Sequence, residues 1–140
     1  MRSRRVRIFV ACKDSVSEFI QQIEPVLGFQ MTSNEGNVLG LRATRELLYV
    51  YSDSKNHYGL SIRRQNYLIN DDDLNFEDYD YEIRCYAEEI ENNLSEELRI
   101  ADEFARIIFN RLKSMNQFRL MLVDDIDEKL DEFYPKSNNG

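Results

Sequence analysis

The chain is poor in the residues that usually mark a catalytic or metal site. Its 140 residues include one histidine, two cysteines, two prolines, five glycines and no tryptophan. Two cysteines are too few for a disulfide framework, and Cys12 and Cys85 lack the spacing of metal ligands. Each lies in an apolar or alternating run, which favours reduced cysteines packed as small hydrophobic residues. A single disulfide bridge between neighbouring strands remains the alternative.

The scarcity of histidine and glycine argues against several enzyme classes. The one histidine, His57, lies in a polar turn, and the sequence contains no nucleophile elbow, zinc-protease motif, P-loop or dinucleotide fingerprint. We therefore expect a protein that is not a nucleophilic or nucleotide-dependent enzyme. A mechanism that uses only paired carboxylates stays open, because acids that meet in space are invisible in sequence.

Long apolar runs are also lacking. Residues 8–12 follow a basic start and superficially resemble a lipoprotein signal, but the run is shorter than such a signal requires, and Lys13 and Asp14 follow it directly. No stretch approaches the ~20 apolar residues of a membrane span. We therefore expect a cytoplasmic protein with no membrane association.

What the chain does contain is typical of one globular domain. Hydrophobic residues make up 42% and charged residues 31%, and eight Phe and eight Tyr supply bulky core material. A chain of this length is near the commonest size of a single domain. We expect one domain over residues 1–135 and a flexible tail over residues 136–140.

The hydrophobic periodicity alternates between strand and helix patterns. Ser15 and Glu18 form a capping box, so a helix should begin there after a strand at residues 6–11 and should finish near Pro25 or Gly28. A period of two then predicts short strands that pair as an antiparallel meander. These strands are expected at residues 29–33, 38–43, 47–51 and 58–63.

The second half predicts a strand at residues 79–85, with alternate residues facing the core and the others bearing carboxylates. A long apolar stripe indicates a helix opened by Ser95, followed by a strand at residues 118–123. Ile126, Leu130 and Phe133 suggest a last short helix. The predicted fold class is α+β, a mainly antiparallel sheet (meander) with two to three helices packed on one face.

Negative charge is concentrated in one part of the chain. Residues 71–102 carry thirteen acids and two bases, a net charge of −11, whereas the whole chain carries −8. Residues 1–65 are net +4 and residues 103–140 net −1. A concentrated field of one sign attracts partners of the opposite sign.

The strand at residues 79–85 should present its carboxylates together with those of the flanking loops. Tyrosines alternate with these acids, and tyrosine offers an interface rigid area with a polar tip. A solvated acidic surface without a partner is the plainer alternative. The expected partner-binding residues are Asp71, Asp72, Asp73, Asp78, Asp80, Tyr81, Glu82, Glu88 and Glu89.

Such a face suits a basic protein and repels nucleic acid. The only opposing signal is the basic start of the chain, where Arg2, Arg4, Arg5 and Arg7 lack interleaved aromatics. We expect these arginines to neutralise the protein's own acids.

Calcium is the main alternative ligand. Asp71, Asp73, Asn75, Glu77 and Glu82 occupy positions 1, 3, 5, 7 and 12 of an EF-hand-like loop. However, the position that requires glycine is Phe76, and the segment leads into a strand pattern. We therefore expect no metal and no cofactor, and keep a small-molecule or calcium-binding module as an alternative.

The whole-chain pattern resembles the small acidic immunity proteins of bacterial toxin systems, including those of contact-dependent growth inhibition. The resemblance rests on a strand and helix at residues 5–28, a meander, the acid-bearing strand Tyr79-Asp80-Tyr81-Glu82-Ile83, a long helix and a closing segment at residues 120–125. It covers nearly the full length without a diagnostic motif.

This resemblance implies a cytoplasmic, non-catalytic inhibitor that binds one cognate toxin, commonly a basic nuclease, and occludes its active site. The protein would act as a monomer or weak dimer.

Overall fold

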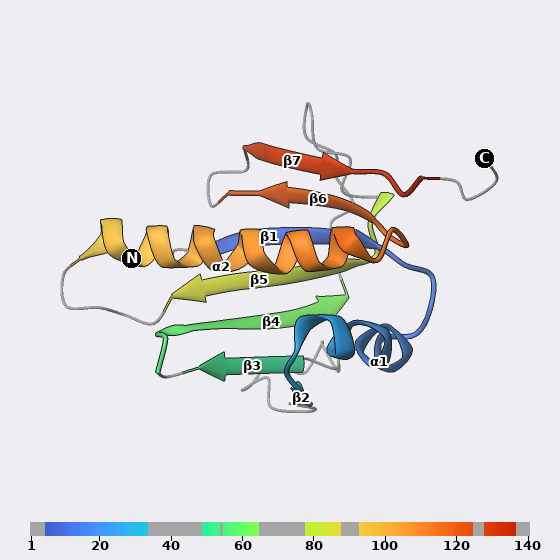
Figure 1. Cartoon of the computed structure of the whole chain (residues 1–140), viewed down its shortest axis with the longest axis horizontal. Coiled ribbons are helices and arrows are strands. Elements are labelled where there is room, and N and C mark those ends of the chain that lie inside the picture. Colours follow the sequence, from blue (N-terminus) through green and yellow to red (C-terminus); the bar gives the residue numbers. More distant parts are fainter. Residues whose placement is uncertain are drawn as a thin grey trace, which may run out of the picture.

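The computed structural model describes residues 5–33, 49–53, 55–64, 78–87, 93–124 and 128–136. These residues form a seven-stranded antiparallel sheet with two helices on one face (Figure 1), which confirms the predicted α+β class. The strands are β1 (Arg5–Ala11), β2 (Thr32–Ser33), β3 (Tyr49–Asp53), β4 (Tyr58–Arg64), β5 (Tyr81–Ala87), β6 (Arg119–Val123) and β7 (Lys129–Phe133). The helices are α1 (Val16–Leu27) and α2 (Leu94–Ser114).

The strand order is β2-β3-β4-β5-β1-β6-β7. Strands β2 to β5 follow one another as the predicted antiparallel meander, and β1 then lies between β5 and β6. Arg64 at the end of β4 pairs with Tyr81 at the start of β5, and the end of β7 pairs with the start of β6. The end of β1 also lies there, between the starts of β5 and β6, and this is the right-hand end of the sheet in Figure 1.

Local sequence explains both ends of α1. The Ser15 side chain accepts a hydrogen bond from the Glu18 backbone N–H, and Glu18 accepts one from the Ser15 backbone in return, which confirms the capping box. The helix runs through Pro25 and ends at Gly28, whose φ of +84° is the left-handed conformation that glycine adopts readily.

Helix α2 begins one residue before the predicted Ser95, because Asn93 supplies the N-cap and accepts a hydrogen bond from the Glu96 backbone N–H at 3.0 Å. Its buried stripe packs mainly against β5 and β1. Phe104 also stacks on Tyr58 of β4, with ring centroids 4.0 Å apart. Helix α2 therefore contacts three neighbouring strands, β4, β5 and β1.

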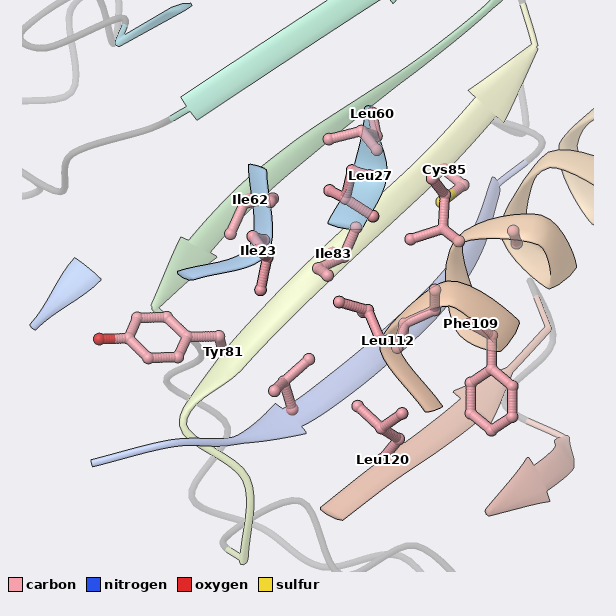
Figure 2. Close-up of a cluster of buried hydrophobic side chains, with 14 of the residues drawn as sticks. Ile23, Leu27, Leu60, Ile62, Tyr81, Ile83, Cys85, Phe109, Leu112 and Leu120 are labelled. Carbon is pink, nitrogen blue, oxygen red and sulfur yellow. The ribbon is translucent and has the colours of Figure 1, made fainter. Parts of the chain in front are cut away.

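The main core lies between the helices and the sheet. In β5 the alternation places Tyr81, Ile83 and Cys85 on this side, as predicted (Figure 2). Helix α1 contributes Ile23 and Leu27 to the same layer. Alternation thus correctly identified these three inward-facing residues, whereas Tyr79, which alternation assigned to the same side, belongs to a separate cluster.

The opposite face of the sheet has a small apolar cluster of its own. Phe9, Tyr79, Met121 and Val123 are all buried there, with Ala11 packed against them. The ring of Tyr79 meets that of Phe9 edge to face. This face is therefore not a fully hydrated surface, contrary to the sequence-based expectation that one side of residues 79–85 is open to water or a partner.

Two predicted elements differ from the structure. The segment Lys129–Phe133 is not helical as predicted but is the edge strand β7, and Leu130 and Phe133 reach the core from it. The predicted strand at residues 29–33 is reduced to Thr32–Ser33. The strand predicted at residues 38–43 lies outside the described residues. Pairing with β6 satisfies backbone groups of β7, which outweighs a helical pattern of only three apolar residues.

Substitution by alanine should destabilise the protein by different amounts at two glycines. A Cβ at Gly59 would lie 2.8 Å from the Tyr51 backbone oxygen, so the strands must separate, at a cost of about 2 kcal/mol. A Cβ at Gly28 would meet only the Arg111 side chain at 3.8 Å. Gly28→Ala should therefore lower the free energy of unfolding by only about 1 kcal/mol, because alanine is strained at this positive φ. Urea unfolding of Gly59→Ala and Gly28→Ala measures the loss of unfolding free energy in each variant. Equal losses in the two variants would contradict the steric argument.

Candidate functional site

Glu82 lies at the centre of an arginine cluster on the face of the sheet opposite the helices. Its side chain is 0% exposed, and its Oε1 accepts hydrogen bonds from Arg84 Nε at 2.9 Å and Arg63 Nε at 3.2 Å. Arg7 Nη1 lies 3.8 Å from Oε2. The prediction that Glu82 is displayed to a partner is therefore wrong, because three arginines of its own chain enclose the carboxylate.

Strand register produces this cluster. Arg63 lies directly opposite Glu82 in the β4/β5 pair, and Arg84 lies two residues further along the same face of β5. Arg7 lies opposite Arg84 in the β1/β5 pair, diagonal to Glu82. One carboxylate thus connects three adjacent strands. For Arg7, the expectation that the basic start neutralises the protein's own acids is confirmed.

Asp80 has a structural role at the start of β5. Its Oδ2 accepts a hydrogen bond from the Cys12 backbone N–H at 2.8 Å, and its Oδ1 accepts one from Lys13 Nζ at 3.2 Å. The Asp80 backbone N–H donates to the Val10 carbonyl at 2.9 Å. With a side chain only 17% exposed, Asp80 joins the ends of β1 and β5 and presents little carboxylate surface to a partner.

Tyr81 belongs to the core. Its ring stacks on that of Phe19 with centroids 4.6 Å apart, its hydroxyl donates to the Asp14 carbonyl, and Arg64 Nη2 donates to the same hydroxyl at 3.3 Å. Burial raises the pKa of this phenol. The suggested contact of Tyr81 with a partner is therefore wrong, since alternation turns the ring toward α1.

Of the remaining predicted site residues, the structure describes only Asp78. Asp78 is exposed and lies 3.4 Å from Arg119 Nη1, whereas Asp71, Asp72, Asp73, Glu88 and Glu89 lie outside the described residues. Residues 65–77 leave from the end of β4, and residues 88–92 leave from the far end of β5. Seven residues of β5 separate these points by about 20 Å.

An aromatic and guanidinium stack beside Asp78 escaped the sequence prediction. The Arg119 guanidinium lies between two tyrosine rings, 5.1 Å from the centroid of Tyr79 and 4.7 Å from that of Tyr134. Burial acts to lower the pKa of Arg119, but the phenols of Tyr79 and Tyr134 raise it overall. Tyr134 follows β7 and precedes Pro135, and no motif marks it.

The two cysteines are free and distant from each other. Cys85 pairs with Val6 near the start of β1, whereas Cys12 follows the end of β1, so about 20 Å of strand separates them. This excludes the bridge that the sequence had left open. Burial raises the pKa of both thiols, which lowers their reactivity as nucleophiles.

The calcium alternative loses one ligand. Glu82, which would occupy position 12, is engaged by arginines, and the other four positions lie outside the described residues. Among the residues that the structure describes, no three His, Cys, Asp or Glu side chains form a group that could hold a metal ion. His57, with a φ of +62°, lies in the turn between β3 and β4.

No described helix is both long enough and apolar enough to cross a bilayer. Comparison with known proteins gives no relative: no family model matches the chain, nor does any curated protein or solved structure.

Proposed function

We propose that the protein is a non-catalytic inhibitor that binds a cognate basic toxin, in the manner of an immunity protein. The observation that supports this proposal is the distribution of charge. Of the net charge of −8, residues 65–77 contribute four acids and residues 88–92 three, with no base in either segment. The strand carboxylates Asp80 and Glu82 have partners within the chain, so the surplus charge resides in these connections.

The docking region proposed here differs from the one expected from sequence. Asp80, Tyr81 and Glu82 support the sheet, and the acids of residues 71–78, which follow β4 and precede β5 in the sequence, provide the attraction. Glu88 and Glu89 follow the opposite end of β5 and are not needed for this surface. Attraction between a negative end and a basic protein increases the association rate, most strongly at low salt.

Charge removal tests the proposal. The triple variant Asp71→Asn, Asp72→Asn, Asp73→Asn should slow association with the toxin about tenfold at low salt, and much less at high salt, because screening already weakens the attraction there. The probe is the purified product of the gene adjacent to this one, inactivated at its own catalytic residues. Stopped-flow or biosensor kinetics over a series of salt concentrations measure the rate.

A matched control removes the same charge elsewhere. Glu96→Gln, Asp102→Asn and Glu103→Gln together also neutralise three acids, on the exposed side of α2, and should change the rate less than twofold. Equal slowing by both triple variants would show that only net charge matters. If the wild-type protein forms no complex with the adjacent gene product and does not protect cells that express its active form, the proposed function is wrong.

A further inference from the structure

Tyr134 is the most exposed large hydrophobic side chain of the described residues, at 54%. The others, Leu94, Leu98 and Ile107, all lie on α2. The Tyr134 ring is nevertheless held in place. It packs on the Arg119 guanidinium, its hydroxyl accepts a hydrogen bond from Arg119 Nη2 at 3.0 Å, and the same hydroxyl lies 3.4 Å from Glu132 Oε2, to which it donates.

Arg119 is itself fixed on its other side. Its guanidinium packs over the buried ring of Tyr79, and its Nη1 lies 3.4 Å from Asp78 Oδ2. Tyr79 in turn contacts Phe9 of β1, in the second apolar cluster. The exposed ring is therefore the outermost layer of a stack that begins in the interior of the sheet.

The backbone on both sides of Tyr134 is restrained as well. Phe133 ends β7, and the Asn116 side chain binds the backbone of Lys136 twice. Asn116 Nδ2 donates to the Lys136 carbonyl at 3.1 Å, and the Lys136 N–H donates to Asn116 Oδ1 at 2.7 Å. A side chain that is already immobile loses little conformational entropy when it is buried at an interface.

The segments of sequence that contain Tyr79 and Tyr134 are acidic. Residues 71–80 carry six acids and no base, and residues 124–136 carry six acids and two lysines. Arg119 and the Lys13 that pairs with Asp80 offset only a small part of this charge. A basic protein surface is the partner that complements it.

We infer that Tyr134, held on Arg119, is the aromatic anchor of the surface that binds a basic protein partner. This inference deepens the proposed function and rests on it. Tyrosine and arginine are enriched among the residues that dominate binding energy, and such anchors are buried at the centre of an interface with charged residues around them. The ring enters a recess of the partner, and the carboxylates of Asp78 and Glu132 beside it face the partner's lysines and arginines.

Substitution of Tyr134 tests this assignment on the inactivated adjacent gene product. Tyr134→Ala should weaken the Kd about 30-fold or more, mainly through faster dissociation, as expected for an anchor residue. Tyr134→Phe keeps the ring on Arg119, so its Kd should stay within about threefold of the wild-type value. Ile107→Ala, which truncates another exposed side chain on α2, is the matched control and should leave the Kd unchanged. Urea unfolding of each variant checks that the fold is retained.

Two outcomes separate this inference from the function on which it rests. If Tyr134→Ala binds as tightly as Ile107→Ala while the Asp71, Asp72 and Asp73 triple variant still associates slowly, Tyr134 is not the anchor and the proposed function stands. If the wild-type protein does not bind the adjacent gene product at all, both proposals fail.

Discussion

Glu82→Gln should lower the free energy of unfolding by about 3 kcal/mol, the loss expected when one partner of a buried ionic cluster is removed. The amide keeps the volume and one acceptor oxygen but removes the negative charge that Arg7, Arg63 and Arg84 surround. These three side chains are 11%, 35% and 19% exposed, so water screens them only in part. Urea unfolding followed by circular dichroism measures the loss.

A surface ion pair provides the control. Asp102 accepts a hydrogen bond from Arg106 Nε at 2.9 Å, but both side chains are more than a third exposed. Asp102→Asn should therefore cost less than about 1 kcal/mol, as is usual for exposed pairs. A loss for Glu82→Gln no larger than that for Asp102→Asn would show that the cluster adds no more stability than a pair in water.

Phe19→Ala should cost about 3 to 5 kcal/mol, the range for removal of a buried phenylalanine. The Phe19 ring is fully buried between α1 and the sheet, stacked on Tyr81 and edge to face with Phe118 at 5.5 Å. Alanine leaves a cavity beneath α1 and also removes the contact that orients Tyr81. Thermal unfolding monitored by circular dichroism should show a large decrease in Tm.

Ile107→Ala is the control for this loss as well, because Ile107 is 46% exposed and should change stability by less than about 0.5 kcal/mol. Hydrogen exchange adds a local measurement. In Phe19→Ala, protection should fall first in α1. If the stability of Phe19→Ala equals that of Ile107→Ala, α1 is held chiefly by its other contacts and the packing argument is wrong.

The sequence predicted much of the fold because its signals are local. The capping box at Ser15, the left-handed Gly28 and the period of two in residues 79–85 each depend on neighbours a few residues away. β7 was mistaken for a helix for the opposite reason. Its strand conformation depends on pairing with β6, and the Lys129–Phe133 segment has no clear strand pattern of its own.

The candidate site was less predictable. Alternation correctly placed Glu82 on the face away from the helices, but it cannot show whether that face is hydrated. Arg7, Arg63 and Arg84 come from three strands, and only the register of β4, β5 and β1 brings them to one carboxylate. The Tyr79, Arg119 and Tyr134 stack likewise combines three separate segments.

The sequence by itself determined the class of fold, the inward face of β5 and of the two helices, and an excess of negative charge between the meander and the long helix. Periodicity and composition suffice for these features, since they depend on adjacent residues or on sums over the chain. Only the tertiary structure decided which charges are neutralised internally and which aromatic ring is presented outward. Those outcomes depend on distances between residues far apart in the chain, which strand register and packing set.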